Sequence, residues 1–167
     1  MMHPVELSPS DLLKECQTTR TRGSGPGGQH RNKVETAISL LHLPTGIQGE
    51  ATEKRSQEAN RQQALKRLRL KLAVEVRQLE RLDDLPSPLW KKRFPQGKLN
   101  ISPNHEDFPI VLAEALDVLQ GHEYEMNQAA IHLGCSSSQL ARLLKLEPSA
   151  FAEVNRIRSK LGYHTLK

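Results

Sequence analysis

The hydrophobic and polar positions in the first half of the chain predict a small β-sheet. Residues 14–22 alternate loosely between polar and apolar side chains and include three threonines, which is typical of a strand. Residues 37–43 are mostly apolar and predict a second strand, which ends at the Pro-Thr-Gly turn signal of residues 44–46. Residues 47–51 would then return as the next strand of a hairpin.

A long amphipathic helix is predicted over residues 52–82, which contain neither Gly nor Pro. Apolar residues recur there in steps of three and four, so they would form one stripe that packs on the sheet. The opposite face is basic, and a merely solvated helix face is the alternative interpretation of those charges. The stripe consists of Leu65, Leu68, Leu72, Val76, Leu79 and Leu82, and the basic face of Lys54, Arg55, Arg61, Lys66, Arg67, Arg69 and Lys71.

Proline content predicts a linker after this helix. Residues 83–109 contain five prolines and the basic run Lys91-Lys92-Arg93. Trp90 and Phe94 in this segment are expected to anchor it on one of the domains rather than to stack on bases. Beyond it, the pattern predicts helices over residues 110–119, 125–133, 137–144 and 149–161. The expected domains are 1–85, a linker over 86–108, and a helical module over 109–167.

Two of the predicted C-terminal helices have the pattern of a helix-turn-helix. Gly134 would end the first, and Ser136 or Ser137 would cap the second. The second helix offers few polar side chains and lies in a module of net negative charge, so helical packing or binding of a protein partner is favoured over DNA reading. Those polar side chains are Gln139, Arg142 and Lys145. The expected fold class is α+β: a small β-sheet with a long packed helix and an exposed loop, followed by a small all-α, helix-turn-helix-like module.

Charge is distributed unevenly along the chain. The net charge is +5 and the isoelectric point about 9.4. Residues 1–102 hold 18 Lys and Arg against 11 Asp and Glu, whereas residues 103–167 hold 6 against 8. A basic first part with no long apolar run favours a nucleic acid over a membrane as the partner, with a merely solubilising surface as the alternative.

The cysteines, histidines and N-terminus exclude several classes of protein. Cys16 and Cys135 form no CxxC pair, so neither a disulfide framework nor a cysteine zinc site is expected. No HxxxH spacing and no calcium loop occurs, so we expect neither a metal nor another cofactor. The first residues lack the features of a signal or transit peptide, which favours a cytoplasmic location.

The most distinctive segment is a glycine-rich loop over residues 22–33, Arg-Gly-Ser-Gly-Pro-Gly-Gly-Gln-His-Arg-Asn-Lys, in which four of the ten glycines fall within six residues. Glycine reaches positive φ and lets a backbone approach a ligand closely, while proline fixes its own φ. Gln29 is the one sizeable polar side chain at the tip of this loop. A segment of this composition is suited to presenting its backbone to a ligand.

The segment resembles the GGQ loop of the class I peptide chain release factors. The resemblance continues through His30 and Asn32, the run His-Leu-Pro-Thr-Gly-Ile over residues 42–47, Arg-Ser-Gln over residues 55–57, Asn60 and Ala64. It covers about residues 14–80, the catalytic domain of that family, which is far more specific than a Gly-Gly-Gln tripeptide alone.

The resemblance implies an activity, which is hydrolysis of the peptidyl-tRNA ester in the peptidyl transferase centre of the large ribosomal subunit. Gly27, Gly28 and Gln29 would be the catalytic residues, and no cofactor is implied. Gln29 has no usable pKa, so it cannot act as a general base. The family assigns the stabilisation of the oxyanion to its backbone amide and the shaping of the water site to its side chain. N5-methylation of Gln29 is implied as well.

Basic and polar residues around the loop are expected to bind RNA, where they would contact phosphates of a polyanionic cavity. His30 is favoured as an RNA contact over a titrating base, because the family places the chemistry on the neighbouring amide. Arg31 and Pro26 depart from the common residues of the family, but neither removes the chemistry. The expected RNA contacts are Arg22, His30, Arg31, Asn32, Lys33, Arg55, Gln57 and Arg61.

Only about a dozen residues precede the first predicted strand, so the sequence given contains no codon-reading region before the loop. The chain therefore resembles the codon-independent ribosome-rescue hydrolases of the ArfB type, although its C-terminal part is folded rather than a basic tail. That module would bind a ribosomal protein, a split large subunit or a partner factor, and a monomer is expected. The alternatives are a non-catalytic ribosome- or RNA-binding protein and a helix-turn-helix regulator that binds nucleic acid.

Overall fold

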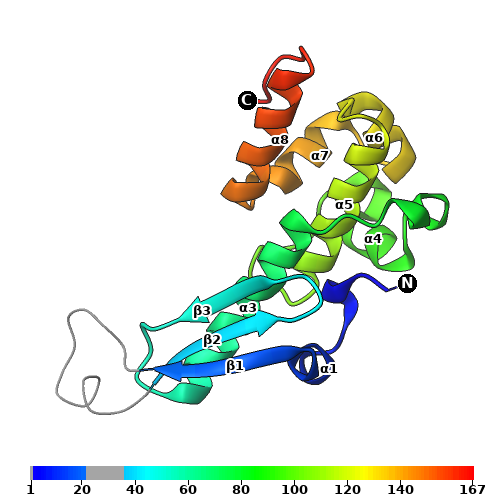
Figure 1. Cartoon of the computed structure of the whole chain (residues 1–167). Helices are drawn as coiled ribbons and strands as arrows, with labels where there is room; N and C mark the ends of the chain where they lie inside the picture. Colours follow the sequence, from blue (N-terminus) through cyan, green and yellow to red (C-terminus); the bar gives the residue numbers. More distant parts are fainter. Residues whose placement is uncertain (1, 22–35) are drawn as a thin grey trace. The chain divides into compact units, whose positions relative to one another are not determined.

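The computed structural model describes residues 2–21 and 36–167, which form two compact units (Figure 1). Unit 1 is Met1–Glu75 and unit 2 is Val76–Lys167. Unit 1 combines a sheet with a long helix, and unit 2 is built from helices, which confirms the expected α+β class. The packing divides the chain between Glu75 and Val76, whereas the boundaries at 85 and 108 stay a prediction.

Unit 1 is built on a three-stranded antiparallel sheet in the order β1-β2-β3. In the register of the sheet Thr21 lies opposite Ala37, and Ile38 lies opposite Ala51. The three strands confirm the small sheet that the hydrophobic pattern and the turn signal predict. Their bounds are Cys16–Thr21 for β1, Ala37–His42 for β2 and Ile47–Ala51 for β3.

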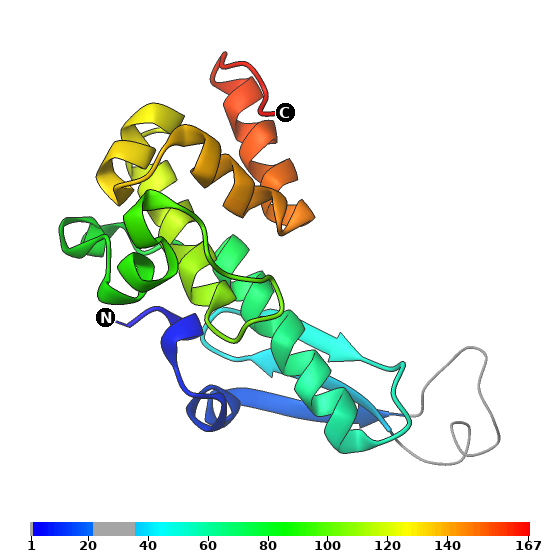
Figure 2. The ribbon, with the colours of Figure 1, turned by 180° about the vertical axis from the view of Figure 1, so that it is seen from behind.

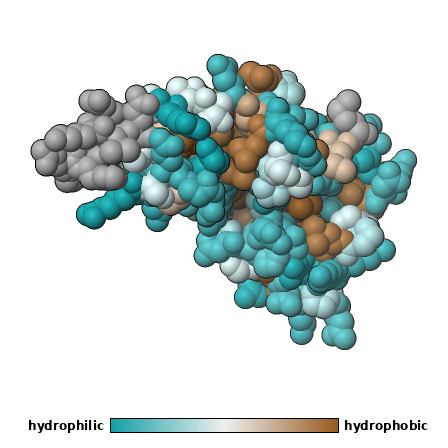
Figure 3. Space-filling model, turned by 90° about the horizontal axis from the view of Figure 1, so that it is seen from below, coloured by the Kyte–Doolittle hydropathy of each residue, from teal (hydrophilic) through white to brown (hydrophobic). Residues whose placement is uncertain are grey.

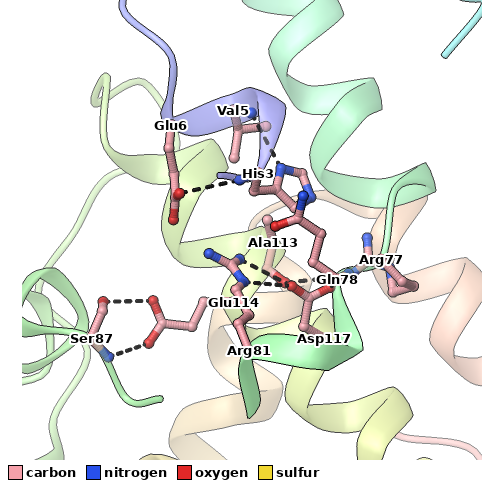
Figure 4. Close-up of polar contacts among 10 residues, drawn as sticks. All are labelled: His3, Val5, Glu6, Arg77, Gln78, Arg81, Ser87, Ala113, Glu114 and Asp117. Carbon is pink, nitrogen blue, oxygen red and sulfur yellow. Dashed lines mark hydrogen bonds and ion pairs between the residues drawn. The ribbon is translucent and has the colours of Figure 1, made fainter. Parts of the chain in front are cut away.

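The hydrophobic pattern does not predict the two short helices before β1, the 3₁₀ helix η1 (Pro4–Glu6) and α1 (Pro9–Lys14). Local capping explains both. The Nδ1 atom of His3 accepts a hydrogen bond of 3.2 Å from the Val5 amide (Figure 4), and the Ser8 hydroxyl accepts one of 3.2 Å from the Asp11 amide. Each helix begins with a proline, whose fixed φ suits the first helical position.

The turn between β2 and β3 is the Leu-Pro-Thr-Gly segment of the family pattern. Gly46 adopts a positive φ of 74° and donates its amide to the His42 carbonyl at 2.8 Å. The fully buried His42 ring bonds to Thr45 Oγ1 through Nδ1 and to Glu15 Oε2 through Nε2, each at 2.7 Å. This part of the pattern therefore stabilises the end of the sheet.

Helix α3 (Gln57–Glu75) covers one face of the sheet, as Figure 2 shows. Leu68 and Leu72 are completely buried on its inner side, which confirms these two members of the predicted stripe. The predicted Leu65 is only half-buried, and its neighbour Ala64 is completely buried. Close approach of the helix depends on Gly49 in β3. A Cβ atom at that position would lie 2.5 Å from the Ala64 carbonyl oxygen and 2.6 Å from the Leu68 nitrogen.

The prediction of one helix over residues 52–82 is wrong at both ends. At the start, the Ser56 hydroxyl caps the helix by accepting a hydrogen bond of 3.0 Å from the Ala59 amide. At the end, the Gln78 amide bonds to the Asp117 carboxylate at 3.1 Å instead of to a helical carbonyl. The chain continues from there as the 3₁₀ helix η2 (Leu79–Asp84), in which Leu79 is exposed.

Unit 2 is arranged around α5, whose residues 108–119 are buried except for the half-buried Ile110. Helices α4, α6 and α7 and the 3₁₀ helix η2 pack on it, and α8 packs on α7. The four helices predicted from the pattern are confirmed to within about two residues at each end. The bounds are Pro88–Arg93 for α4, Phe108–Gly121 for α5, Met126–Leu133 for α6, Ser137–Lys145 for α7 and Pro148–Lys160 for α8.

The proline-rich residues 86–108 contain α4 and the 3₁₀ helix η3 (Pro95–Gly97). Trp90 is 1% exposed, stacks on Phe94 with ring centroids 4.1 Å apart, and donates from Nε1 to the Leu133 carbonyl at 2.9 Å. The expectation that these aromatic residues anchor the segment is therefore confirmed.

Polar residues cover most of the face seen in Figure 3, with smaller hydrophobic areas between them. Among the described residues, no helix is both long and apolar enough to span a membrane.

Candidate functional site

The candidate catalytic residues and five of the expected RNA contacts lie outside the described residues. What the structure does describe is the framework that holds both ends of this segment. The residues concerned are Gly27, Gly28 and Gln29, together with Arg22, His30, Arg31, Asn32 and Lys33.

Two neighbouring strands hold the ends of the glycine-rich segment. Thr21 is the last residue of β1, and it lies opposite Ala37, the first residue of β2. The described residues on either side of this segment therefore lie at the same end of the sheet. The contacts of the residues that flank the segment therefore constrain where the segment can lie.

The returning end is held by a buried hydrogen-bond cluster. Thr36 is 1% exposed, and its carbonyl accepts a hydrogen bond of 2.7 Å from Nδ2 of Asn60 in α3. Nδ2 also donates to the Lys54 carbonyl at 3.1 Å, and Oδ1 accepts from the Lys54 amide at 3.0 Å. The completely buried Asn60 side chain thus uses both of its donor hydrogens and its acceptor.

Asn60 belongs to the family pattern quoted above, but the sequence did not predict its role. One signal in the sequence could have revealed it. Asn60 precedes the buried residues Ala64, Leu68 and Leu72 at four-residue spacing, so a poor helix former stands at the first position of a buried stripe. A polar residue at such a position usually has a specific hydrogen-bonding partner.

Three of the expected RNA contacts are described, and all lie at the start of α3. Arg55 is exposed immediately before the capping residue, and Gln57 is half-buried. Arg61 pairs with Glu58 at 3.1 Å and keeps 33% of its side-chain surface exposed. Because Asn60 joins the first turns of α3 to Thr36, these cations lie at the same end of unit 1 as the base of the loop.

Some of the basic residues predicted on the outer face of this helix are engaged within unit 1. Arg67 forms an ion pair with Glu53 and donates to the Glu50 carbonyl at 2.9 Å. Hydrogen bonding to Arg67 is the main reason that the pKa of Glu53 falls to about 2. Lys71 donates to the Gln48 carbonyl at 2.9 Å. These contacts attach α3 to β3, and they reduce the charge available to a polyanion.

Helices α6 and α7 of unit 2 form the expected helix-turn-helix arrangement. Gly134 has a φ of 73° at the end of α6, and the Ser136 hydroxyl caps α7 through the Gln139 amide at 3.1 Å. The Gln139 side chain accepts a hydrogen bond of 2.8 Å from the Leu99 amide, so it holds the preceding loop. Arg142 and Lys145 are exposed on α7.

A buried ionic cluster connects the beginning of unit 2 to α5 (Figure 4). The Asp117 carboxylate has no exposed surface, and Arg77 and Arg81 donate to it at 3.1 and 3.0 Å. On the same helix, Glu114 accepts hydrogen bonds of 2.7 Å from both the amide and the hydroxyl of Ser87. Sequence analysis did not identify this cluster, and its burial and pairing indicate a structural role.

The described residues offer neither a metal site nor an activated thiol. Within residues 2–21 and 36–167, no group of three or more His, Cys, Asp and Glu side chains lies in a position to bind a metal ion. Burial raises the pKa of Cys135 to about 11, so its thiol is protonated and weakly nucleophilic at neutral pH. Burial also raises the pKa of Cys16.

Comparison with known proteins relates the chain to one family. Residues 5–89 match the model of the RF-1 domain. The chain is also 32% identical over 129 residues to peptide chain release factor 1 of Xylella fastidiosa (strain 9a5c), an alignment that covers 70% of this chain and 34% of that protein. The chain thus spans about a third of the length of this relative. With the RF-1 domain model matching half of its residues, the chain belongs to the RF-1 domain family.

Proposed function

We propose that this protein hydrolyses the peptidyl-tRNA ester on the ribosome and releases nascent chains without reading a codon. The observation that carries the proposal is the Gly-Gly-Gln sequence of residues 27–29 in an RF-1 domain, between two strand ends that lie opposite each other. The ribosome and its peptidyl-tRNA would be the partners, the cytoplasm the location, and no cofactor or metal would take part.

The proposed chemistry depends on a backbone donor rather than on a titrating side chain. The amide of Gln29 would stabilise the oxyanion that forms when water attacks the ester, and its side chain would position that water. Removal of one donor from such a site typically costs about 3–4 kcal/mol of transition-state stabilisation. Gly27 and Gly28 would allow the backbone to approach the end of the tRNA without a steric clash.

Contacts between basic residues and ribosomal RNA would position the loop in the peptidyl transferase centre. Arg55 and Arg61 offer cationic groups at the end of unit 1 where the loop is held, and both retain exposed surface. Guanidinium groups suit phosphate because they form paired, charge-assisted hydrogen bonds. We assign the same role to Gln57 and to the basic residues within the loop.

Unit 2 would supply further affinity for the ribosome in place of codon reading. Residues 85–105 contain four Lys and Arg and no acidic residue. Arg93 is paired with Asp107 at 2.8 Å, while Lys91, Lys92 and Lys98 are exposed. An exposed lysine group of this kind fits RNA phosphates. A protein partner of α6 to α8, a monomeric state and N5-methylation of Gln29 also stay predictions.

The first test is release of a nascent peptide from ribosomes stalled on mRNA without a stop codon. Wild type should release the peptide, and the Gly28→Ala variant should release it at least about 100-fold more slowly, because the added Cβ disturbs the approach of the oxyanion donor. The rate of release is also measured on ribosomes that carry a stop codon in the decoding site, for comparison. A marked requirement for the stop codon would contradict codon independence.

Equal release by wild type and Gly28→Ala would exclude the proposed chemistry. Binding to ribosomes without release would instead favour the non-catalytic alternative. The helix-turn-helix regulator has less support, since Gln139 is engaged with Leu99. That alternative requires Arg142→Ala to weaken binding to a specific duplex DNA while leaving peptide release unchanged.

A further inference from the structure

Asn60 is the one side chain of α3 that is hydrogen-bonded to the returning end of the glycine-rich segment, among the contacts described. It occupies the first position of a stripe whose next members are Ala64, Leu68 and Leu72, all completely buried. An apolar residue would suit both the helix and the core better. The presence of an amide therefore requires an explanation in its contacts.

The geometry of these contacts matches an amide and no other side chain of similar size. Nδ2 donates to the carbonyls of Thr36 and Lys54, and Oδ1 accepts from the Lys54 amide. A carboxylate would place a negative oxygen against two carbonyl oxygens, and a leucine would leave three backbone groups without these bonds. The site thus selects asparagine for one specific arrangement of the backbone.

That arrangement links two segments that are distant in the sequence. Lys54 lies two residues before Ser56, the capping residue of α3, and Thr36 lies three residues after the end of the glycine-rich segment. The carbonyl of Thr36 lies one residue beyond the last pair of β1 and β2, Thr21 and Ala37. Strand pairing therefore ends just where Asn60 begins to hold the chain.

From these contacts we infer that Asn60 is a positioning residue for hydrolysis: it fixes the returning end of the catalytic loop to α3 and so sets where the Gly-Gly-Gln backbone is presented. The inference rests on the proposed function. Asn60 itself touches neither substrate nor the reacting atoms. Its effect follows from the steep dependence of rate on the placement of catalytic groups, in which an error of about 1 Å can cost about 100-fold.

The test compares Asn60→Asp, which keeps the shape and removes the donors, with His42→Ala. His42→Ala is the control. His42 is also polar and completely buried, but it lies at the opposite end of β2, where its side chain bonds to Glu15 and Thr45. Each full-length variant is assayed only if its circular dichroism spectrum matches that of wild type. The Asn60→Ser variant is made in parallel, so that it can replace Asn60→Asp if that variant does not fold.

Two measurements distinguish positioning from general destabilisation. In single-turnover release, Asn60→Asp should lower kcat by about 10- to 100-fold and change KM by less than about threefold, because ribosome contacts are kept. His42→Ala should leave both constants within about threefold of wild type. In hydrogen exchange, amides of residues 36–38 should exchange faster in Asn60→Asp than in His42→Ala.

Each outcome decides between the inference and the function on which it rests. A folded Asn60→Asp or Asn60→Ser variant with faster exchange but wild-type kcat would overturn the positioning role and leave the proposed function intact. An equal loss of kcat in His42→Ala would also overturn it, because general destabilisation would then explain both. No release by wild type would overturn the proposed function and the positioning role with it.

Discussion

Gly49 shows how one residue determines the packing of unit 1. An added Cβ atom would lie within 2.6 Å of two backbone atoms of α3, which cannot rotate away as a flexible side chain could. The sheet and the helix can therefore approach this closely only with glycine at this position. Sequence analysis predicted that the helix packs on the sheet, but not which residue of β3 permits the contact.

Gly49→Ala should destabilise unit 1 by about 1–3 kcal/mol, since either β3 or α3 must shift to relieve the overlap. Urea denaturation followed by far-ultraviolet circular dichroism measures the effect. Gly46→Asn is the matched control, because an added Cβ atom there would meet no atom within 4 Å and asparagine tolerates the positive φ. If Gly49→Ala lowered the free energy of unfolding no more than the control does, this account of the packing would be contradicted.

At the scale of elements, η2 is attached to α5 by a buried ionic cluster as well as by the Leu82 side chain, which packs against Gly121. Asp117 receives hydrogen bonds from Arg77, Arg81 and the Gln78 amide, and it is completely buried. The predicted continuation of α3 through this region fails for the same reason, because the amide of Gln78 bonds to Asp117. An acidic residue distant in sequence thus binds the chain three residues after the last residue of α3.

Asp117→Ala should lower the free energy of unfolding of unit 2 by about 3–5 kcal/mol, because it leaves two largely buried guanidinium groups without this carboxylate. The fluorescence of Trp90 reports the transition, since it is the one tryptophan of the chain and lies buried in unit 2. Asp83→Ala, at an exposed position of η2, should change the stability by less than about 0.5 kcal/mol. Similar stabilities for the two variants would show that the cluster contributes little.

Across the whole molecule, basic charge occurs in both units. Exposed arginines lie at the start of α3 in unit 1, and the acid-free residues 85–105 lie in unit 2. The net charge of residues 103–167 is negative, but unit 2 begins at Val76 and therefore also contains the exposed residues Lys91, Lys92 and Lys98. Binding to a ribosome through both units would therefore depend on salt concentration.

The double substitution of Lys91→Gln and Lys92→Gln should weaken ribosome binding and reduce the slope of log K against log salt by about 1–2. Equilibrium binding to purified ribosomes at several salt concentrations measures the slope. The control replaces Lys160 and Lys167, two exposed lysines elsewhere in unit 2, by glutamine. An equal slope for the two double variants would exclude a specific role for the α4 lysines.

The sequence by itself determined those features that depend on neighbouring residues. Loose alternation predicted the first strand, and an apolar run followed by a turn signal predicted the hairpin of the next two. Glycine marked the end of α6 and serine the start of α7, and the Gly-Gly-Gln pattern with its following motifs indicated the family. Side-chain periodicity, turns and caps are properties of a few consecutive residues, so they can be read from the chain directly.

Only the tertiary structure decided the features that join distant residues. Asp117 binds the Gln78 amide just beyond α3, Gly49 permits the close packing of the sheet on α3 at Ala64, and Asn60 binds the Thr36 carbonyl. Neither propensity nor periodicity encodes such pairs, since each partner acquires its role only when the fold brings the other within hydrogen-bonding or van der Waals distance.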